Sequence, residues 1–330
     1  MPGGRNLLRG GLVRLAAAEP ARKVAQRPLI FQEVLRRFVA GPDGSAGLDV
    51  AAVLLGKGRL VSLAMLTPSP AGPEEVADRI AGYRALLAEI AARGLTGPGG
   101  LAGPGGLDLT LAVSRLGFDD AVAAAPQSRD WRAVLGRARS ICQAATNAGT
   151  TVTVEAEALA WADATHLIVD DLRQDYPDVG VCVPAAWRRT EGDAVELARR
   201  GGRVRLVRGA TVPEAGYLVE RGEIDRAYVR VMRILLEGRG RPGLFTHDPR
   251  ILAIAEALAV RLGRSGRTGR GMEYVMRYGV RTETQIVIAD RGDRMRVLVP
   301  FGPDWYPYVV QRLADQPRQL VDLIRAAAAR

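Results

Sequence analysis

Short apolar runs alternate with longer, helix-like segments along most of the chain. The runs have the length of buried strands, and the segments between them carry helix start and stop signals. One such segment, residues 73–93, begins with a proline, and another, residues 130–149, ends with a glycine. The eight runs span residues 60–66, 107–113, 151–156, 180–184, 203–207, 244–247, 272–276 and 295–300. Eight alternations of strand and helix predict an α/β fold of the (β/α)8 TIM-barrel type.

The predicted barrel covers residues 59–330, and residues 1–58 are predicted to form an N-terminal helical arm. A glycine- and proline-rich insert at residues 95–107 leads into the second strand. It is therefore expected on the face of the barrel that serves stability, as a flexible loop without a role in chemistry.

Two arginines stand inside the fifth run. Alternate residues of a strand face opposite sides, so Arg203 and Arg205 share one face and Val204 and Leu206 the other. A guanidinium that lies against the protein interior needs an anion beside it. Two partners remain open, a carboxylate on a neighbouring strand or an anionic ligand at the strand's end. Because Arg205 lies further along the strand, it is predicted to reach the ligand-facing mouth, where Glu155 is a second possible partner.

Composition narrows the function classes. The chain has 330 residues, 48% of them hydrophobic and 25% charged, which is enough for a substantial core. The net charge of +10 suggests nucleic acid, but the arginines are spread along the chain without interleaved aromatic residues, which disfavours that partner. With two histidines and two separated cysteines, no metal site is expected, and Cys142 and Cys182 are predicted to be buried and reduced. The absence of a signal peptide or a membrane-length apolar run predicts a cytoplasmic location.

Chemistry in such a barrel gathers where the strands end, on the C-terminal face. The predicted strand ends carry arginines, a glycine and a Thr-His pair, a combination that suits a phosphate-bearing ligand because glycine lets backbone N–H groups approach closely. The residues at these ends are Ser114, Arg115, Glu155, Glu157, Pro184, Arg208, Gly209, Thr246, His247, Asp248, Pro300 and Gly302.

Seven short motifs, taken in order, resemble the FAD-dependent proline dehydrogenases. They are RFVAG (37–41), LAVSRLG (111–117), VEAE (154–157), RLVRGA (205–210), THDPR (246–250), YGVR (278–281) and VPFGPDWYPYVVQRLADQP (299–317). The resemblance implies a distorted (β/α)8 barrel with FAD on its C-terminal face. It also implies oxidation of proline to pyrroline-5-carboxylate, with electrons passed to a quinone.

The resemblance assigns roles to individual residues. Arg205 matches the arginine that contacts the reactive nitrogen of the flavin, and Arg208 replaces a lysine beside the FAD phosphates. Thr246 and His247 match a pair that meets the pyrophosphate and adenosine side of the cofactor. The remaining matches are Gly209, Ala210, Ala156 and Pro184 on the cofactor and Glu155, Tyr308, Gln311 and Arg312 on the substrate side.

The chain also departs from the family pattern, mostly on the substrate side. Ala112 stands where the family has a lysine, and Gln311 where it has one of two carboxylate-binding arginines. Glu155 replaces an aspartate, Pro184 a glutamine and Leu298 a tyrosine, and residues 67–69 read TPS instead of LGE. Two functions therefore stay open. One is an enzyme that oxidises proline or a related cyclic or secondary amine, for which a peripheral place at the inner face of a membrane stays open. The other is a catalytically degenerate relative that acts as a binding or regulatory protein.

Overall fold

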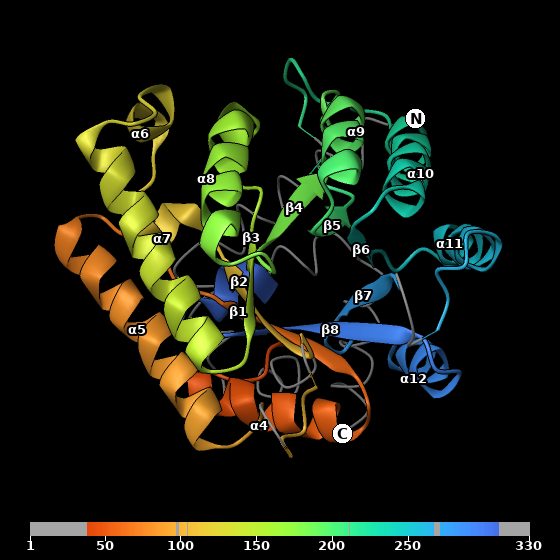
Figure 1. Ribbon diagram of the computed structural model, residues 1–330, viewed down its shortest axis with the longest axis horizontal. Helices are drawn as coiled ribbons and strands as arrows, with labels where there is room; N and C mark the ends of the chain where they lie inside the picture. Colours follow the sequence, from red (N-terminus) through yellow and green to blue (C-terminus); the bar gives the residue numbers. More distant parts are fainter. Residues whose placement is uncertain (1–37, 97–98, 104, 211, 267–270, 310–330) are drawn as a thin grey trace, which may run out of the picture.

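Eight parallel strands close into a barrel in the order β1 to β8, with β8 paired back to β1 (Figure 1). The computed structural model describes residues 38–96, 99–103, 105–210, 212–266 and 271–309. The strands are β1 (Leu60–Met65), β2 (Leu107–Leu111), β3 (Thr151–Val154), β4 (Gly180–Pro184), β5 (Arg203–Val207), β6 (Arg241–Phe245), β7 (Glu273–Arg277) and β8 (Arg294–Phe301). Every predicted run overlaps one of them, so the predicted (β/α)8 barrel is confirmed.

Helices surround the barrel wall and connect the strands. They are α4 (Gly44–Gly56), α5 (Pro73–Ala92), α6 (Asp120–Ala124), α7 (Arg129–Asn147), α8 (Ala162–Asp175), α9 (Thr190–Arg200), α10 (Arg221–Glu237), α11 (Pro249–Arg261) and α12 (Thr282–Asp290), with 3₁₀ turns η1 (Val113–Leu116) and η2 (Leu159–Trp161). Of the predicted arm, residues 1–37 lie outside the described residues. Its described helix, α4, packs on β1 and β8 (Figure 1). The arm's boundary at residue 58 stays a prediction.

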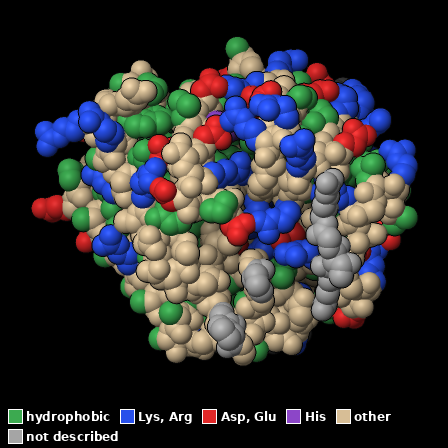
Figure 2. Space-filling model, viewed as in Figure 1, with side chains coloured by type: hydrophobic (Ala, Val, Ile, Leu, Met, Phe, Trp, Pro, Cys, Tyr) green, Lys and Arg blue, Asp and Glu red, His purple; other side chains and the backbone are tan. Residues whose placement is uncertain are grey.

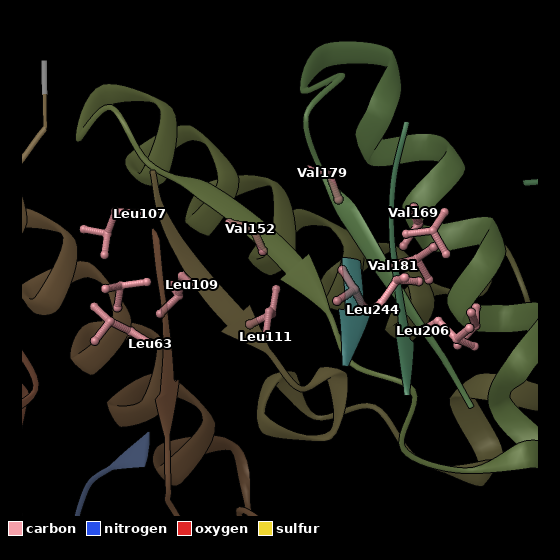
Figure 3. Packing of buried hydrophobic residues seen from close by; sticks show 14 of the residues in the cluster. Leu63, Leu107, Leu109, Leu111, Val152, Val169, Val179, Val181, Leu206 and Leu244 are labelled. Carbon is pink, nitrogen blue, oxygen red and sulfur yellow. The ribbon is translucent and has the colours of Figure 1, made fainter. Parts of the chain in front are cut away.

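The outward faces of the strands are aliphatic and pack under the helices. Leu107, Leu109 and Leu111 of β2 are fully buried, and Figure 3 shows them in one cluster with side chains of the neighbouring strands. Aliphatic side chains at alternate positions give the wall its hydrophobic outer layer, which contributes about 1.5–3 kcal/mol for each fully buried Leu or Val. The positions between them face the barrel interior, which is polar.

Two smaller predictions can be compared with the structure. Cys142 and Cys182 are both free and buried, as predicted. The insert before β2 has a contact that the sequence did not suggest, because the carbonyl of Gly105 accepts a hydrogen bond from Arg296 inside the barrel. Among the described helices, none is both long enough and apolar enough to cross a membrane.

Candidate active site

At the N-terminal end of the barrel, a buried arginine and a glutamate form a closed pair. Arg296 is fully buried and donates from Nε to Glu273 Oε2 at 2.6 Å and from Nη2 to Oε1 at 3.0 Å. Its remaining donors reach the carbonyls of Val61 and Gly105 at 2.8 and 2.7 Å. Burial alone would raise the pKa of Glu273, but Arg296 outweighs it and lowers that pKa to about 2. At this end of the interior, the charges of Arg296 and Glu273 therefore satisfy each other.

Asp108 of β2 stands at the centre of the interior. Its carboxylate is fully buried and accepts hydrogen bonds from Ser62 Oγ at 2.7 Å and from Thr153 Oγ1 at 2.9 Å. It also accepts from Arg203 Nη1 at 3.0 Å and from Arg205 Nη2 at 2.7 Å. Burial by itself raises the pKa of Asp108, but the guanidinium groups of Arg203, Arg205 and Arg296 shift that pKa well below its usual range.

These contacts answer the question raised by the two arginines of β5. Arg203 and Arg205 both face the interior, 8% and 4% exposed, and both form an ion pair. Their shared carboxylate comes from β2, three strands away from β5 in the barrel, rather than from a neighbouring strand. Gly243 lies beside Arg205 in the register of β5 and β6, and a Cβ there would lie 3.2 Å from Val275 Cγ2. A larger residue at this position would therefore crowd Val275 of β7.

Toward the C-terminal mouth the polar contacts are looser. Arg205 Nη1 lies 3.6 Å from Glu155 Oε1, and Glu155 follows directly after β3 with its side chain 30% exposed. Burial between the strand ends raises the pKa of Glu155, and Arg205 only partly opposes this shift. Within the described part of the chain, Arg205 Nη1 and Thr110 Oγ1 are buried and have no hydrogen-bond partner. Most buried polar atoms in proteins have a hydrogen-bond partner, so these two atoms need an explanation.

The loop after β5 brings together the residues matched to the phosphate side of a cofactor. Gly209 has φ +82°, and a Cβ added there would lie 2.8 Å from Pro184 Cβ and 3.0 Å from Ala186 Cβ. The loop is thus close-packed against the end of β4, and Ala210 beyond it is exposed. Arg208 donates from Nε to Asp225 Oδ1 at 3.2 Å, so its charge is partly matched by α10.

Thr246 and His247 lie just past β6, at the neighbouring strand end. His247 Nε2 accepts a hydrogen bond of 2.9 Å from the backbone N–H of Arg277, so a neutral imidazole carries its proton on Nδ1. The guanidinium of Arg277 lies 4.7 Å from the centroid of the Phe245 ring. Thr246 is buried, and its Oγ1 accepts a hydrogen bond from the backbone N–H of Asp248 at 3.2 Å. The predicted pair therefore sits on the C-terminal rim.

The residues matched to the substrate side are only partly described. Gln311 and Arg312 lie outside the described residues. Tyr308 is half-buried and packs against a small apolar cluster made by Phe38, Val39, Val280 and Val309. Ala156 is half-buried beside Glu155, and Leu298 lies buried in β8. The roles of all these residues stay predictions.

The sequence interpretation missed Asp108, whereas Arg115 was among the residues predicted at the strand ends. Asp108 is a single acidic residue within an apolar run, and its charge opposite to the β5 arginines was the available signal. Arg115, in η1 just after β2, is half-buried and donates to Ser69 Oγ at 2.9 Å. Within the described residues Arg115 has no ion pair, which makes it a further cation on the C-terminal rim.

The outer surface of the helices carries a mixed charge. Figure 2 shows Lys and Arg side chains lying beside Asp and Glu side chains over the face it presents. Arg189 pairs with Asp163 and Asp193, and Arg200 pairs with Asp170 across α8 and α9. Much of the positive charge seen in the sequence is therefore locally neutralised on these helices.

Known proteins of one kind resemble this chain. The family model described as proline dehydrogenase matches residues 49–315. "Proline dehydrogenase 2" of Bacillus subtilis subsp. natto is 31% identical over 181 residues, which cover 54% of this chain and 59% of that protein. "Proline dehydrogenase 1" of Bacillus subtilis (strain 168) is 24% identical over 283 residues, which cover 86% of each. The chain thus spans about six-tenths of the length of the first of these relatives.

Solved structures agree on the fold. Proline utilization A (PutA) from Bdellovibrio bacteriovorus, inactivated by N-propargylglycine, superposes with a TM-score of 0.75 and 20% identity, over 86% of this chain and 32% of that one. PutA from Corynebacterium freiburgense superposes with a TM-score of 0.69 and 15% identity, over 96% of this chain and 33% of that one. At these identities the likeness concerns the fold alone, whereas the family model covers most of the sequence. The chain therefore belongs to the proline dehydrogenase family.

Proposed function

We propose that this protein is an FAD-dependent enzyme that oxidises proline, or a related cyclic or secondary amine, to the corresponding imine and passes the electrons to a quinone. Membership of the proline dehydrogenase family supports the reaction class. The cofactor, the acceptor and the substrate are inferred from the matched residues around the barrel mouth. A cytoplasmic location, with contact to a membrane when a lipid-soluble quinone is used, belongs to the same proposal.

The observation that carries this proposal is a buried guanidinium nitrogen of Arg205, which lies toward the mouth without a hydrogen-bond acceptor among the described residues. Arg205 is 4% exposed and held by Asp108 and Ser62, yet its Nη1 is buried without a hydrogen bond among the described residues. Thr110 Oγ1 on β2 is likewise buried without a hydrogen-bond partner among the described residues. A buried polar atom without a partner costs about 1–3 kcal/mol, so a ligand that accepts from Arg205 would bring net stabilisation.

The residues of the rim fit a dinucleotide-type cofactor. Arg208 and Arg277 supply positive charge at the ends of β5 and β7, and Gly209 lets the loop after β5 pack closely against the end of β4. Thr246 and His247 stand between them on β6. When bound, FAD would accept the hydride from the carbon beside the substrate nitrogen. The residues proposed to hold it are Ala156, Pro184, Arg205, Arg208, Gly209, Ala210, Thr246 and His247.

The chain's own contribution to this reaction is electrostatic positioning. Asp108 fixes one side of the Arg205 guanidinium, so the other side of this cation faces the mouth. Glu155 lies beside that face at 3.6 Å and limits the net charge of the mouth. A preorganised cation of this kind favours negative charge that develops in its neighbourhood during the reaction. Tyr308, Gln311 and Arg312 are proposed to contact the substrate.

A degenerate relative that binds without turnover is the second candidate, because three positions at the mouth have lost polar groups. Pro184 has no N–H to donate, and Ala112 and Leu298 present only apolar side chains. These residues leave fewer partners for a substrate carboxylate than the matched family pattern provides.

An absorbance spectrum of the purified protein separates the two candidates. The enzyme is expected to be yellow and to lose its flavin absorbance when proline is added without oxygen. Flavin that stays oxidised with proline and with other cyclic secondary amines would favour the binding protein. Colourless protein that takes up no added FAD would contradict both flavin-based roles.

A further inference from the structure

A cavity lies outside the barrel wall, between α4 and α12. Both helices pack on β8, and the cavity between them measures about 570 Å³. That volume is within the range of small-molecule sites, which runs from about 300 to 1,000 Å³. Its lining consists of Leu54, Arg59, Tyr278, Gly279 and residues 281–285. It shares no lining residue with the barrel mouth described above.

Arg59 is the unusual member of this lining. The residue is only 7% exposed, and its Nε is buried with no hydrogen-bond partner among the described residues. In the same part of the chain no carboxylate lies within ion-pair distance of it, and Asp290 attracts it only from further away. Burial lowers the pKa of Arg59, against that attraction. Taking a guanidinium out of water without a close anion costs several kcal/mol, so the position is unfavourable unless something else occupies the cavity.

The other end of the cavity is the N-terminus of α12. Arg281 is the N-cap of this helix and has φ +51° and ψ +47°, a left-handed conformation that is rare for a residue with a side chain. No side chain caps the helix, so the N–H groups of its first turn point outward without a capping acceptor. Thr282 and Thr284 line the cavity beside them. Glu283 contributes the one carboxylate of the lining, against two guanidinium groups.

We propose that this cavity is a binding site for a small organic anion with a carboxylate or phosphate group. The anionic group would accept hydrogen bonds from the Arg59 guanidinium and so supply the charge that this buried side chain lacks. The body of the ligand would lie along Leu54 and Tyr278. A second polar group would meet the uncapped first turn of α12 and Arg281, where the partial positive charge of a helix N-terminus favours anions. This site does not depend on the proposed flavin chemistry.

The test compares the thermal unfolding of the wild-type protein and of Arg59→Met, with and without inorganic phosphate or citrate at constant ionic strength. Without anions, Arg59→Met is expected to unfold at a temperature equal to or above that of the wild type, because it removes a buried charge that has no close partner within the described ranges. With a bound anion the wild type gains stability by mass action, and Arg59→Met does not. Comparing phosphate with citrate distinguishes phosphate from carboxylate chemistry.

Two further variants sharpen the test. Arg233→Met removes an exposed arginine of α10, which pairs with Glu237, and should respond to the anions as the wild type does. Arg281→Gln should weaken binding several-fold in calorimetry, and Arg59→Met at least tenfold. If neither anion raises the unfolding temperature of the wild type, or if both raise it equally in the wild type, Arg59→Met and Arg233→Met, the proposal is wrong. If Arg59→Met does not fold, the calorimetric result for Arg281→Gln decides, and unchanged binding there overturns the site.

Discussion

At the N-terminal end of the barrel, Arg296 donates to both oxygens of Glu273, whereas at the C-terminal mouth Arg205 leaves Nη1 at 3.6 Å from Glu155. Both glutamates lie beside a buried arginine, yet the pKa of Glu273 falls to about 2 and that of Glu155 rises. The difference follows from geometry, because two short hydrogen bonds outweigh the cost of burial and a single longer approach does not. Arg296 and Glu273 thus stabilise the N-terminal end of the barrel as a closed pair. Arg205 and Glu155 are less closely paired and lie toward the mouth, where a ligand is proposed to bind.

Asp108 joins the two ends, since Arg203 and Arg205 share its carboxylate. The pair with Arg203 belongs to the closed end and the pair with Arg205 to the mouth. The comparison can therefore be broken by changing charges one at a time, because each loss should affect either the stability of the barrel or the chemistry of the mouth.

The largest loss of stability is expected for Asp108→Asn. It leaves two buried guanidinium groups without their main counter-charge, and removal of one partner from a buried pair costs about 3–5 kcal/mol. Urea unfolding should show this decrease in the free energy of unfolding. Thr153→Val is the matched control, because it removes one hydroxyl from the same carboxylate, leaves both ion pairs in place and should cost only about 1 kcal/mol. Equal effects of the two variants would show that the charge of Asp108 is not what stabilises the interior.

The next largest effect concerns the mouth and rests on the proposed function. Arg205→Lys keeps a positive charge but replaces the planar guanidinium, whose separate nitrogens face Asp108 and the mouth, with a single compact ammonium group. The anaerobic rate of flavin reduction by proline should fall about 100-fold or more, as for other removed electrostatic contacts in active sites. Arg203→Lys is the control, since Arg203 bonds to the same Asp108 and is not paired with Glu155. Similar reduction rates for Arg205→Lys and the wild type would remove Arg205 from the site.

Glu273→Gln should show how much the closed end contributes and at which pH. The folded-state pKa of Glu273 is depressed from 4.5 to about 2, so its contribution of about 3 kcal/mol is present above pH 4.5 and is lost as the pH falls toward 2. The variant should therefore be less stable than the wild type at pH 7 and converge with it near pH 2. Unfolding curves measured at several pH values test this. A constant difference across the whole range would contradict the linkage.

The architecture could be predicted from the sequence because each strand and helix has a local sequence pattern. Apolar runs of strand length and helix end signals recur eight times, and right-handed parallel connections leave a closed barrel as the simplest arrangement. The strand ends then predicted which residues share one face. For that reason Glu155, Thr246 and Gly209 were placed on the C-terminal rim correctly as positions in the fold.

The partners inside the barrel could not be predicted in the same way. Arg205 and Asp108 are 97 positions apart, and only the closure of the barrel and its register bring their side chains together. The burial of Arg59 without a close carboxylate among the described residues is still harder to anticipate, since an arginine before a strand is typical of a surface position. Local pattern decides the elements, whereas the electrostatics of the interior depends on contacts between distant strands.

The smallest change is expected for Glu155→Gln, and its pH dependence has the opposite sign to that of Glu273→Gln. Because burial raises the folded-state pKa of Glu155, its ionised form is disfavoured in the folded protein, and this penalty is relieved as the pH falls through that raised pKa. Glu155→Gln carries no such penalty. It should be about as stable as the wild type in acid and slightly more stable at neutral pH, by less than about 1 kcal/mol because the side chain is partly exposed. Unfolding in urea at pH 4 and pH 8 measures the difference. If Glu155→Gln were instead strongly destabilised at pH 8, Glu155 would be a tight partner of Arg205, and the contrast between the two ends of the barrel would not hold.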